Sequence, residues 1–206
     1  MPSTMKFYRL LFGIVFLLIS LSVSAQKIQA GLGIDKLKIG LKSKKVQKTL
    51  GVPSEVRSTV AERMSLMGEN IEVDKQLPFL LGFDEVWIYD ENSLKQGALP
   101  VSRIYIKGNK VVYIELSVKS EGKYAPSKWQ NAQTEQAIHF QDEASEIEKK
   151  YGNSYLNTVE KDDDLYIFLD NGIAFSTNEA DLIYKIHLFK ALEFAKRDDV
   201  AKALTK

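Results

Sequence analysis

In each half of the chain, three stretches alternate between apolar and polar residues, a pattern typical of β-strands that bury one face. These stretches are 85–90, 101–107 and 110–118 in the first half, and 164–169, 173–176 and 182–189 in the second. The dipeptides Gly108–Asn109 and Asn171–Gly172 separate consecutive stretches and favour tight hairpin turns. The pattern therefore predicts two antiparallel units of three strands each.

A short amphipathic segment precedes each trio of strands. Residues 36–51 and 137–152 align without gaps at an offset of 101, share their apolar positions and end in a glycine. A terminal glycine favours the left-handed conformation that ends a helix. Ser43 and Asp142 are the expected helix caps. The alignment predicts two tandem repeats, each a helix packed on antiparallel strands, which places the chain in the α+β class.

The remaining segments set the expected domain boundaries. The first repeat spans 26–119 and carries an insertion at 61–83, a polar linker occupies 120–135, and the second repeat spans 136–206. The end of the second repeat, 190–204, has the pattern of a C-terminal helix. The insertion is rich in Met, Leu and Phe, so two interpretations are open: a lid packed on the core, or a partner-binding loop.

The N-terminus has the three parts of a secretory signal peptide. Lys6 and Arg9 precede an apolar run over 10–23, and Ala25 follows as a small residue at the expected cleavage position. The apolar run is shorter than the roughly 20 residues that a membrane-spanning helix needs. We therefore expect residues 1–25 to direct export to the periplasm or the medium and to be removed. No other segment is expected to cross a membrane.

Composition excludes several kinds of function. The chain has 206 residues, 45% of them hydrophobic, a net charge of +1 and no cysteine. Thiolate metal sites and cysteine nucleophiles are thereby excluded, and nothing in the charge balance favours nucleic acid as a partner. The two histidines, His139 and His187, lie in strand-like runs without ligand spacing, so neither a metal nor a cofactor is expected. No nucleophile motif supports an enzyme.

Aromatic residues are the candidate binding residues. Period-2 alternation predicts that Trp87, Tyr89, Tyr105 and Tyr113 share the sheet face opposite the first helix. Large rings with polar tips favour binding surfaces. The full candidate set is Trp87, Tyr89, Tyr105, Tyr113, Tyr166 and Phe79. The expected partner is another protein, with an envelope glycan or small ligand as the alternative and a hydrolase as a weaker one. This face has a second interpretation: packing between the repeats or beneath the insertion.

One segment resembles a known family. The run Ile39-Gly40-Leu41-x-Ser43-x-x-Val46-x-x-x-Leu50-Gly51-x-Pro53 is similar to a motif of the β-lactamase inhibitor protein-like superfamily, which includes the SmpA/OmlA outer-membrane assembly proteins. Trp87-Ile88-Tyr89 and the following Gly-Asn hairpin fit the same resemblance. It implies small helices packed on an antiparallel sheet. For the tandem-repeat members, it also implies protein binding through an exposed concave sheet face.

Overall fold

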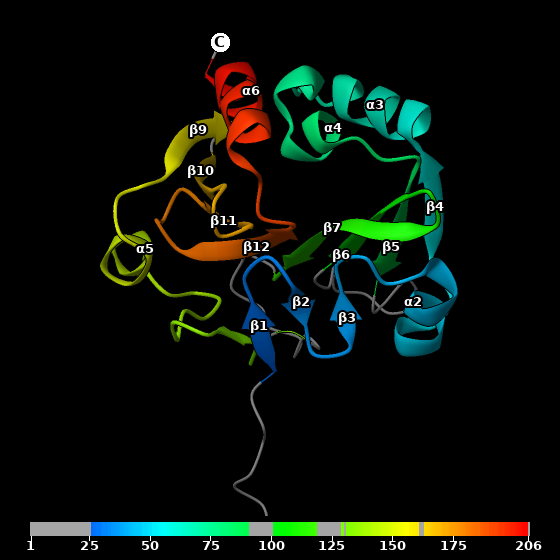
Figure 1. The fold of residues 1–206 in the computed structure, drawn as a ribbon, viewed down its shortest axis with the longest axis horizontal. Coiled ribbons are helices and arrows are strands. Elements are labelled where there is room, and N and C mark those ends of the chain that lie inside the picture. Colours follow the sequence, from blue (N-terminus) through cyan, green and yellow to red (C-terminus); the bar gives the residue numbers. More distant parts are fainter. Residues whose placement is uncertain (1–25, 91–100, 119–128, 130, 161–162, 206) are drawn as a thin grey trace, which may run out of the picture.

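The computed structural model describes residues 26–90, 101–118, 129, 131–160 and 163–205, and the predicted signal peptide lies outside them. The architecture is mixed α+β and has three layers (Figure 1). A large sheet forms the middle layer. A small sheet with two helices covers one face of it, and a group of helices covers the other.

The central sheet has eight strands in the order β4-β5-β6-β7-β12-β11-β10-β9, and every neighbouring pair is antiparallel. Its strands are β4 (Glu55–Ser58), β5 (Glu85–Asp90), β6 (Val101–Lys107), β7 (Lys110–Ser117), β9 (Leu156–Glu160), β10 (Asp163–Phe168), β11 (Ile173–Thr177) and β12 (Ile183–Phe189). The six predicted strands are all present, within one residue at either end. The two edge strands, β4 and β9, were not predicted.

The two predicted hairpin turns differ in length. Lys107 pairs with Lys110, so Gly108–Asn109 forms the expected two-residue turn, with both residues at positive φ. Phe168 pairs with Ile173, which leaves a four-residue connection that Asn171–Gly172 completes. Asn171–Gly172 therefore lies in a hairpin connection, as expected, and this connection is longer than the one at Gly108–Asn109.

The small sheet joins the two halves of the chain. Its order is β3 (Leu37–Lys38), β2 (Gly33–Ile34), β1 (Lys27–Gln29) and β8 (Gln133–Thr134), with β1 and β8 parallel. β8 lies within the predicted linker 120–135. Trp129, from the same segment, is buried and donates its indole N–H to Ser102 Oγ. The end of the predicted linker is thus part of the folded core, because apolar packing and strand pairing hold it there.

Helices α2 (Ser43–Leu50) and α5 (Ala144–Tyr151) stand beside the small sheet, and each ends at a glycine with positive φ, as predicted. The predicted side-chain caps are wrong. The N-cap positions are Lys42 and Glu143, and neither makes a side-chain capping bond. Backbone carbonyl groups of the neighbouring hairpins accept from the helix N-termini instead. The carbonyl of Asn109 accepts from the first N–H of α2, and the carbonyl of Asp181 accepts from the first N–H of α5.

The chain just before each helix makes the same contact in both halves. The amide of Gly40 donates to the carbonyl of Val111 at 2.7 Å, and the amide of Gln141 donates to the carbonyl of Ile183 at 2.7 Å. Gly40 and Gln141 are separated by the offset of 101 seen in the sequence, and both have positive φ. Each helix is therefore anchored to the last strand of its own half.

The opposite face carries α3 (Thr59–Gly68), the 3-10 turn η1 (Val73–Lys75), α4 (Leu77–Leu81) and α6 (Phe194–Leu204) (Figure 1). The C-terminal helix predicted over 190–204 corresponds to α6. Buried residues divide into two clusters, one on each face of the central sheet. Leu77 and Phe83 of the insertion belong to the second cluster, so the insertion packs on the core. No helix within the described ranges is long and apolar enough to span a membrane.

Candidate functional site

The predicted aromatic face is divided between the two sides of the sheet. Trp87 pairs with Ile104, and its neighbour Val86 pairs with Tyr105. Because paired residues point to the same side, Trp87 and Tyr105 point to opposite sides. Alternation is as predicted within β5 and β6, whereas a bulge at Val112 interrupts it in β7. The placement of these aromatics on one shared face is wrong, because it also requires the register between strands.

Trp87, Tyr89 and Tyr166 pack on the side of α2 and the small sheet, in the cluster that contains Val46 of α2. Tyr105 and Tyr113 pack on the side of the insertion, and Phe79 is partly buried against the same cluster. The exposed fractions are 7% for Trp87, 8% for Tyr89, 3% for Tyr105 and 2% for Tyr113. None of these four rings offers a platform on which a protein or a sugar can stack.

The insertion covers its side of the sheet through a chain of aromatic contacts. The ring centroids of Phe79 and Phe83 are 4.9 Å apart, those of Phe83 and Tyr105 4.9 Å, and those of Tyr105 and Tyr113 5.2 Å. All three pairs meet edge to face, which is a favourable geometry for aromatic rings. Of the two interpretations of the segment 61–83, packing on the core accounts for these contacts.

A charged network lies between α3 and the sheet. The side chain of Glu62 is fully buried and accepts from Arg57 of β4 at 3.1 Å and from Arg103 of β6 at 2.6 Å. Glu115 of β7 lies 3.9 Å from Arg103. Burial opposes ionisation of Glu115, but the charges of Arg103 and Lys185 outweigh it, so the pKa of this carboxyl lies below its ordinary value.

His187 is the buried histidine of this face. Its Nδ1 lies 2.9 Å from the hydroxyl oxygen of Tyr113, and its Nε2 lies 2.9 Å from Ser176 Oγ. Burial lowers the pKa of His187 to about 4, so the ring is neutral at pH 7. The sequence suggested half-exposed strand histidines. The side chain of His139 is 44% exposed but lies outside the strands, and His187 lies in β12 but is 6% exposed.

A cavity of about 260 Å³ separates the insertion from this part of the sheet. Arg103, Glu115, Lys185 and His187 line it from the strands, so acidic and basic groups face one another across a small space. Ser176 is 3% exposed and does not line this cavity. Ser176 pairs with Lys185, so it lies on the same sheet face as His187, and its bond to His187 joins β11 to β12.

His187 makes stability depend on pH. Its ordinary pKa of 6.5 applies to the unfolded chain and a pKa of about 4 to the folded one, so between these values the unfolded chain binds the extra proton. Stability therefore falls as pH decreases through this window. From the two pKa values we expect a free energy of unfolding about 2 kcal/mol lower at pH 5 than at pH 7.

Urea denaturation at the two pH values measures this difference, with the other histidine as a matched control. His187→Gln should remove most of the dependence, and His139→Gln should retain it. A difference that survives His187→Gln, or that disappears in His139→Gln, would contradict the assignment.

The outer surface of α3 is apolar, although its inner surface is charged. Val60, Met64 and Met67 are 67%, 69% and 60% exposed, while the buried residue of the helix is Glu62. Spacings of four and three residues place these apolar side chains on one helical face, opposite Glu62. We call Val60, Met64 and Met67 the α3 stripe. The methionines of the insertion are visible in the sequence as candidate contact residues, but the side on which they lie is not.

Comparisons with known proteins identify no relative by sequence. No protein-family model matches the chain, and no curated protein matches it. Solved structures overlap with part of the fold, among them the following two. One is an extracellular protein containing an SCP domain from Bacillus anthracis str. Ames, with 12% identity, a TM-score of 0.41, and coverage of 74% of this chain and 44% of that one. The other is a cysteine-rich secretory protein from Staphylococcus aureus subsp. aureus Mu50, with 7% identity, a TM-score of 0.40, and coverage of 81% and 50%. The chain thus spans half or less of each structure's length. Overlaps of this quality do not establish a shared function.

Proposed function

We propose that the chain is an exported, non-catalytic protein that binds another protein through the α3 stripe. The distribution of side chains on α3 is the observation that carries this proposal. A helix that only had to fold would bury Met64 and Met67 and expose Glu62. Here the carboxylate is buried with two arginines, and the methionines face outward. Exposed methionines are adaptable contact residues at protein-binding surfaces.

Export and the absence of catalysis are parts of the same proposal. Export is supported by the features of residues 1–25 that are typical of a signal peptide. A non-catalytic role is supported by the arrangement around His187. Its serine partner does not line the cavity, and the two acidic side chains that do, Glu69 and Glu115, are matched by the two basic ones, Arg103 and Lys185.

We also propose that the two halves are tandem repeats of the kind found in the β-lactamase inhibitor protein-like superfamily. The support is the recurrence of contacts at an offset of 101: a glycine-terminated helix anchored by its preceding segment to the last strand of the same half. Each half then contributes four strands, and the last strands of the two halves, β7 and β12, pair at the centre of the sheet. Both faces of this sheet are covered, so the proposed binding surface is a helix and not a concave sheet face.

Site-specific photocrosslinking in the producing cells tests the binding surface directly. A photoreactive amino acid at Met64 is expected to yield one discrete protein adduct. The same group at Val52, which is 83% exposed and lies outside the α3 stripe, is the matched control. Adducts of identical pattern at both positions would show only general exposure.

The triple variant Val60→Ser/Met64→Ser/Met67→Ser should weaken binding of the crosslinked partner at least tenfold, because loss of apolar anchors removes most of the energy of such contacts. Its thermal midpoint should stay close to that of the wild type, since these side chains bury little. Unchanged affinity in a folded triple variant would refute the assignment of the α3 stripe.

A further inference from the structure

A second, larger cavity lies on the side of the central sheet where its two halves separate. The ladder between β7 and β12 ends at the pair Tyr113–Phe189. Beyond this pair the two strands diverge. Val111 exchanges backbone hydrogen bonds with Gly40 and Leu41, while Leu192 donates to the carbonyl of Leu169. The divergence leaves a cavity of about 520 Å³, within the roughly 300–1,000 Å³ typical of small-ligand sites.

The walls of this cavity are apolar. A β-bulge contributes two adjacent valines, because Tyr105 pairs with Tyr113 and Ile106 with Val111, which leaves Val112 as the extra residue on β7. The apolar lining residues come from the end of the small sheet, the end of α4, β7 and the connection into α6: Ile39, Leu81, Val111, Val112, Ala191 and Leu192.

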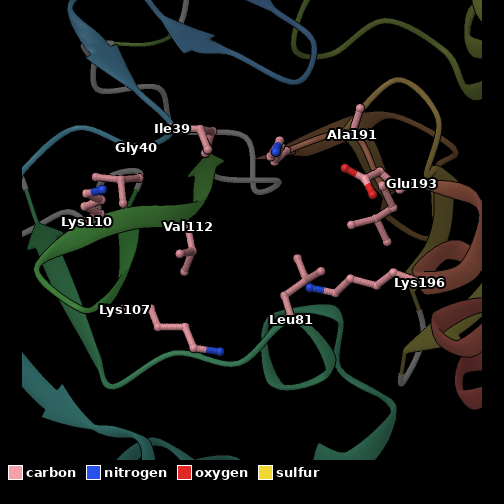
Figure 2. A pocket seen from close by; sticks show the side chains of 12 residues that line it. Ile39, Gly40, Leu81, Lys107, Lys110, Val112, Ala191, Glu193 and Lys196 are labelled. Atoms are coloured by element: carbon pink, nitrogen blue, oxygen red, sulfur yellow. The ribbon is translucent and has the colours of Figure 1, made fainter.

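The rim of the cavity is strongly basic. Lys107, Lys110, Lys190 and Lys196 are four of the twelve lining residues, and Glu193 is the one acidic residue in that set. Figure 2 shows Lys107 and Lys110 on one side and Lys196 reaching in from the other, with Leu81 between them. These four lysines are exposed and form no ion pair within the described part of the chain.

We propose that this cavity binds an amphiphile with an anionic oxygen headgroup and a single apolar chain. The apolar walls remove the chain from water, and the lysines neutralise the headgroup at the rim. A purely polar anion would leave the walls in contact with water. A neutral apolar molecule would leave four like charges around one opening. An apolar chain that carries a carboxylate or phosphate headgroup matches both the apolar walls and the lysine rim. This site is independent of the α3 stripe, so either proposal can fail without the other.

Calorimetric titration of the purified chain beginning at Gln26 tests the proposal with five probes. Decanoate and decyl phosphate are the two headgroup sources, decanol lacks the charge, and acetate and inorganic phosphate lack the chain. We expect at least one of the two charged ten-carbon probes to bind at least tenfold more tightly than decanol and thirtyfold more tightly than the short anions. The tighter of the two identifies the headgroup. Equal affinity for decanol, or for the short anions, would overturn the proposal.

A matched pair of variants locates the binding. Lys107→Gln/Lys196→Gln should weaken binding of the tighter probe at least tenfold and leave the affinity for decanol unchanged. Lys44→Gln/Lys48→Gln removes two lysines of α2 instead and should change neither affinity. All four positions are exposed, so thermal melting should show both variants folded. Equal losses in the two double variants would show general attraction to lysine and refute a site at this cavity.

Discussion

Replacing Trp87 with alanine is expected to lower the free energy of unfolding by about 3–5 kcal/mol, the range for a core aromatic. The ring is 7% exposed and belongs to the core cluster beneath α2 and the small sheet. Its removal leaves a cavity in a cluster to which both halves of the chain contribute. Chemical denaturation of the wild type and the variant measures the difference.

Met64→Ala is the matched control, since this side chain is also large and apolar but 69% exposed. It should change the free energy of unfolding by no more than about 0.5 kcal/mol. A Trp87→Ala variant as stable as the control would contradict the burial of this ring and would restore Trp87 as a surface residue.

Glu62→Ala is expected to cost about 2–3 kcal/mol of stability. Removing one partner of a buried ion pair leaves uncompensated charge, which costs roughly 3–5 kcal/mol when the remaining partner is fully buried. The side chains of Arg57 and Arg103 are 24% and 26% exposed, so partial hydration reduces that cost. Because Glu62 joins α3 to β4 and β6, the insertion should also become more susceptible to proteolysis.

Asp74→Ala provides the comparison for Glu62→Ala. Asp74 pairs with Arg63 of the same insertion, but the two side chains are 87% and 41% exposed. An exposed pair of this kind contributes at most about 1 kcal/mol. If both variants lose the same stability, or if Glu62→Ala leaves cleavage of the insertion unchanged, the buried network does not hold α3 on the sheet.

Six of the eight central strands are readable from the sequence because each is long enough to show alternation and is bounded by turn residues. The strands of the small sheet have two or three residues each, too few for a period of two to be recognised. For the same reason, the sequence of β8 is indistinguishable from that of a linker. The bulge at Val112 shifts the register of β7 by one residue, and no feature of the local sequence marks it.

The candidate site was less predictable because it depends on what covers each face of the sheet. Alternation identified the aromatics, but the pairing of Trp87 with Ile104 decides on which side they lie, and this pairing is a property of the assembled sheet. The position of the insertion then decides their exposure. The α3 stripe had a partial signal in Val60, Met64 and Met67, whose helical spacing is visible in the sequence. The cavity of about 520 Å³ with the lysine rim had no signal in the sequence, because its lining residues come from four separate segments of the chain.

The order of strands also constrains the time course of folding. β12 is the last strand in the chain, yet it lies at the centre of the large sheet, between β7 and β11. Synthesis proceeds from the N-terminus, so β7 keeps an unpaired edge until residues 183–189 emerge. β1 likewise waits for β8, more than one hundred residues later. Such long-range closure slows folding and leaves a strand edge open to intermolecular pairing. A nascent chain of this topology therefore depends on being kept apart from its neighbours until residues 183–189 have been made.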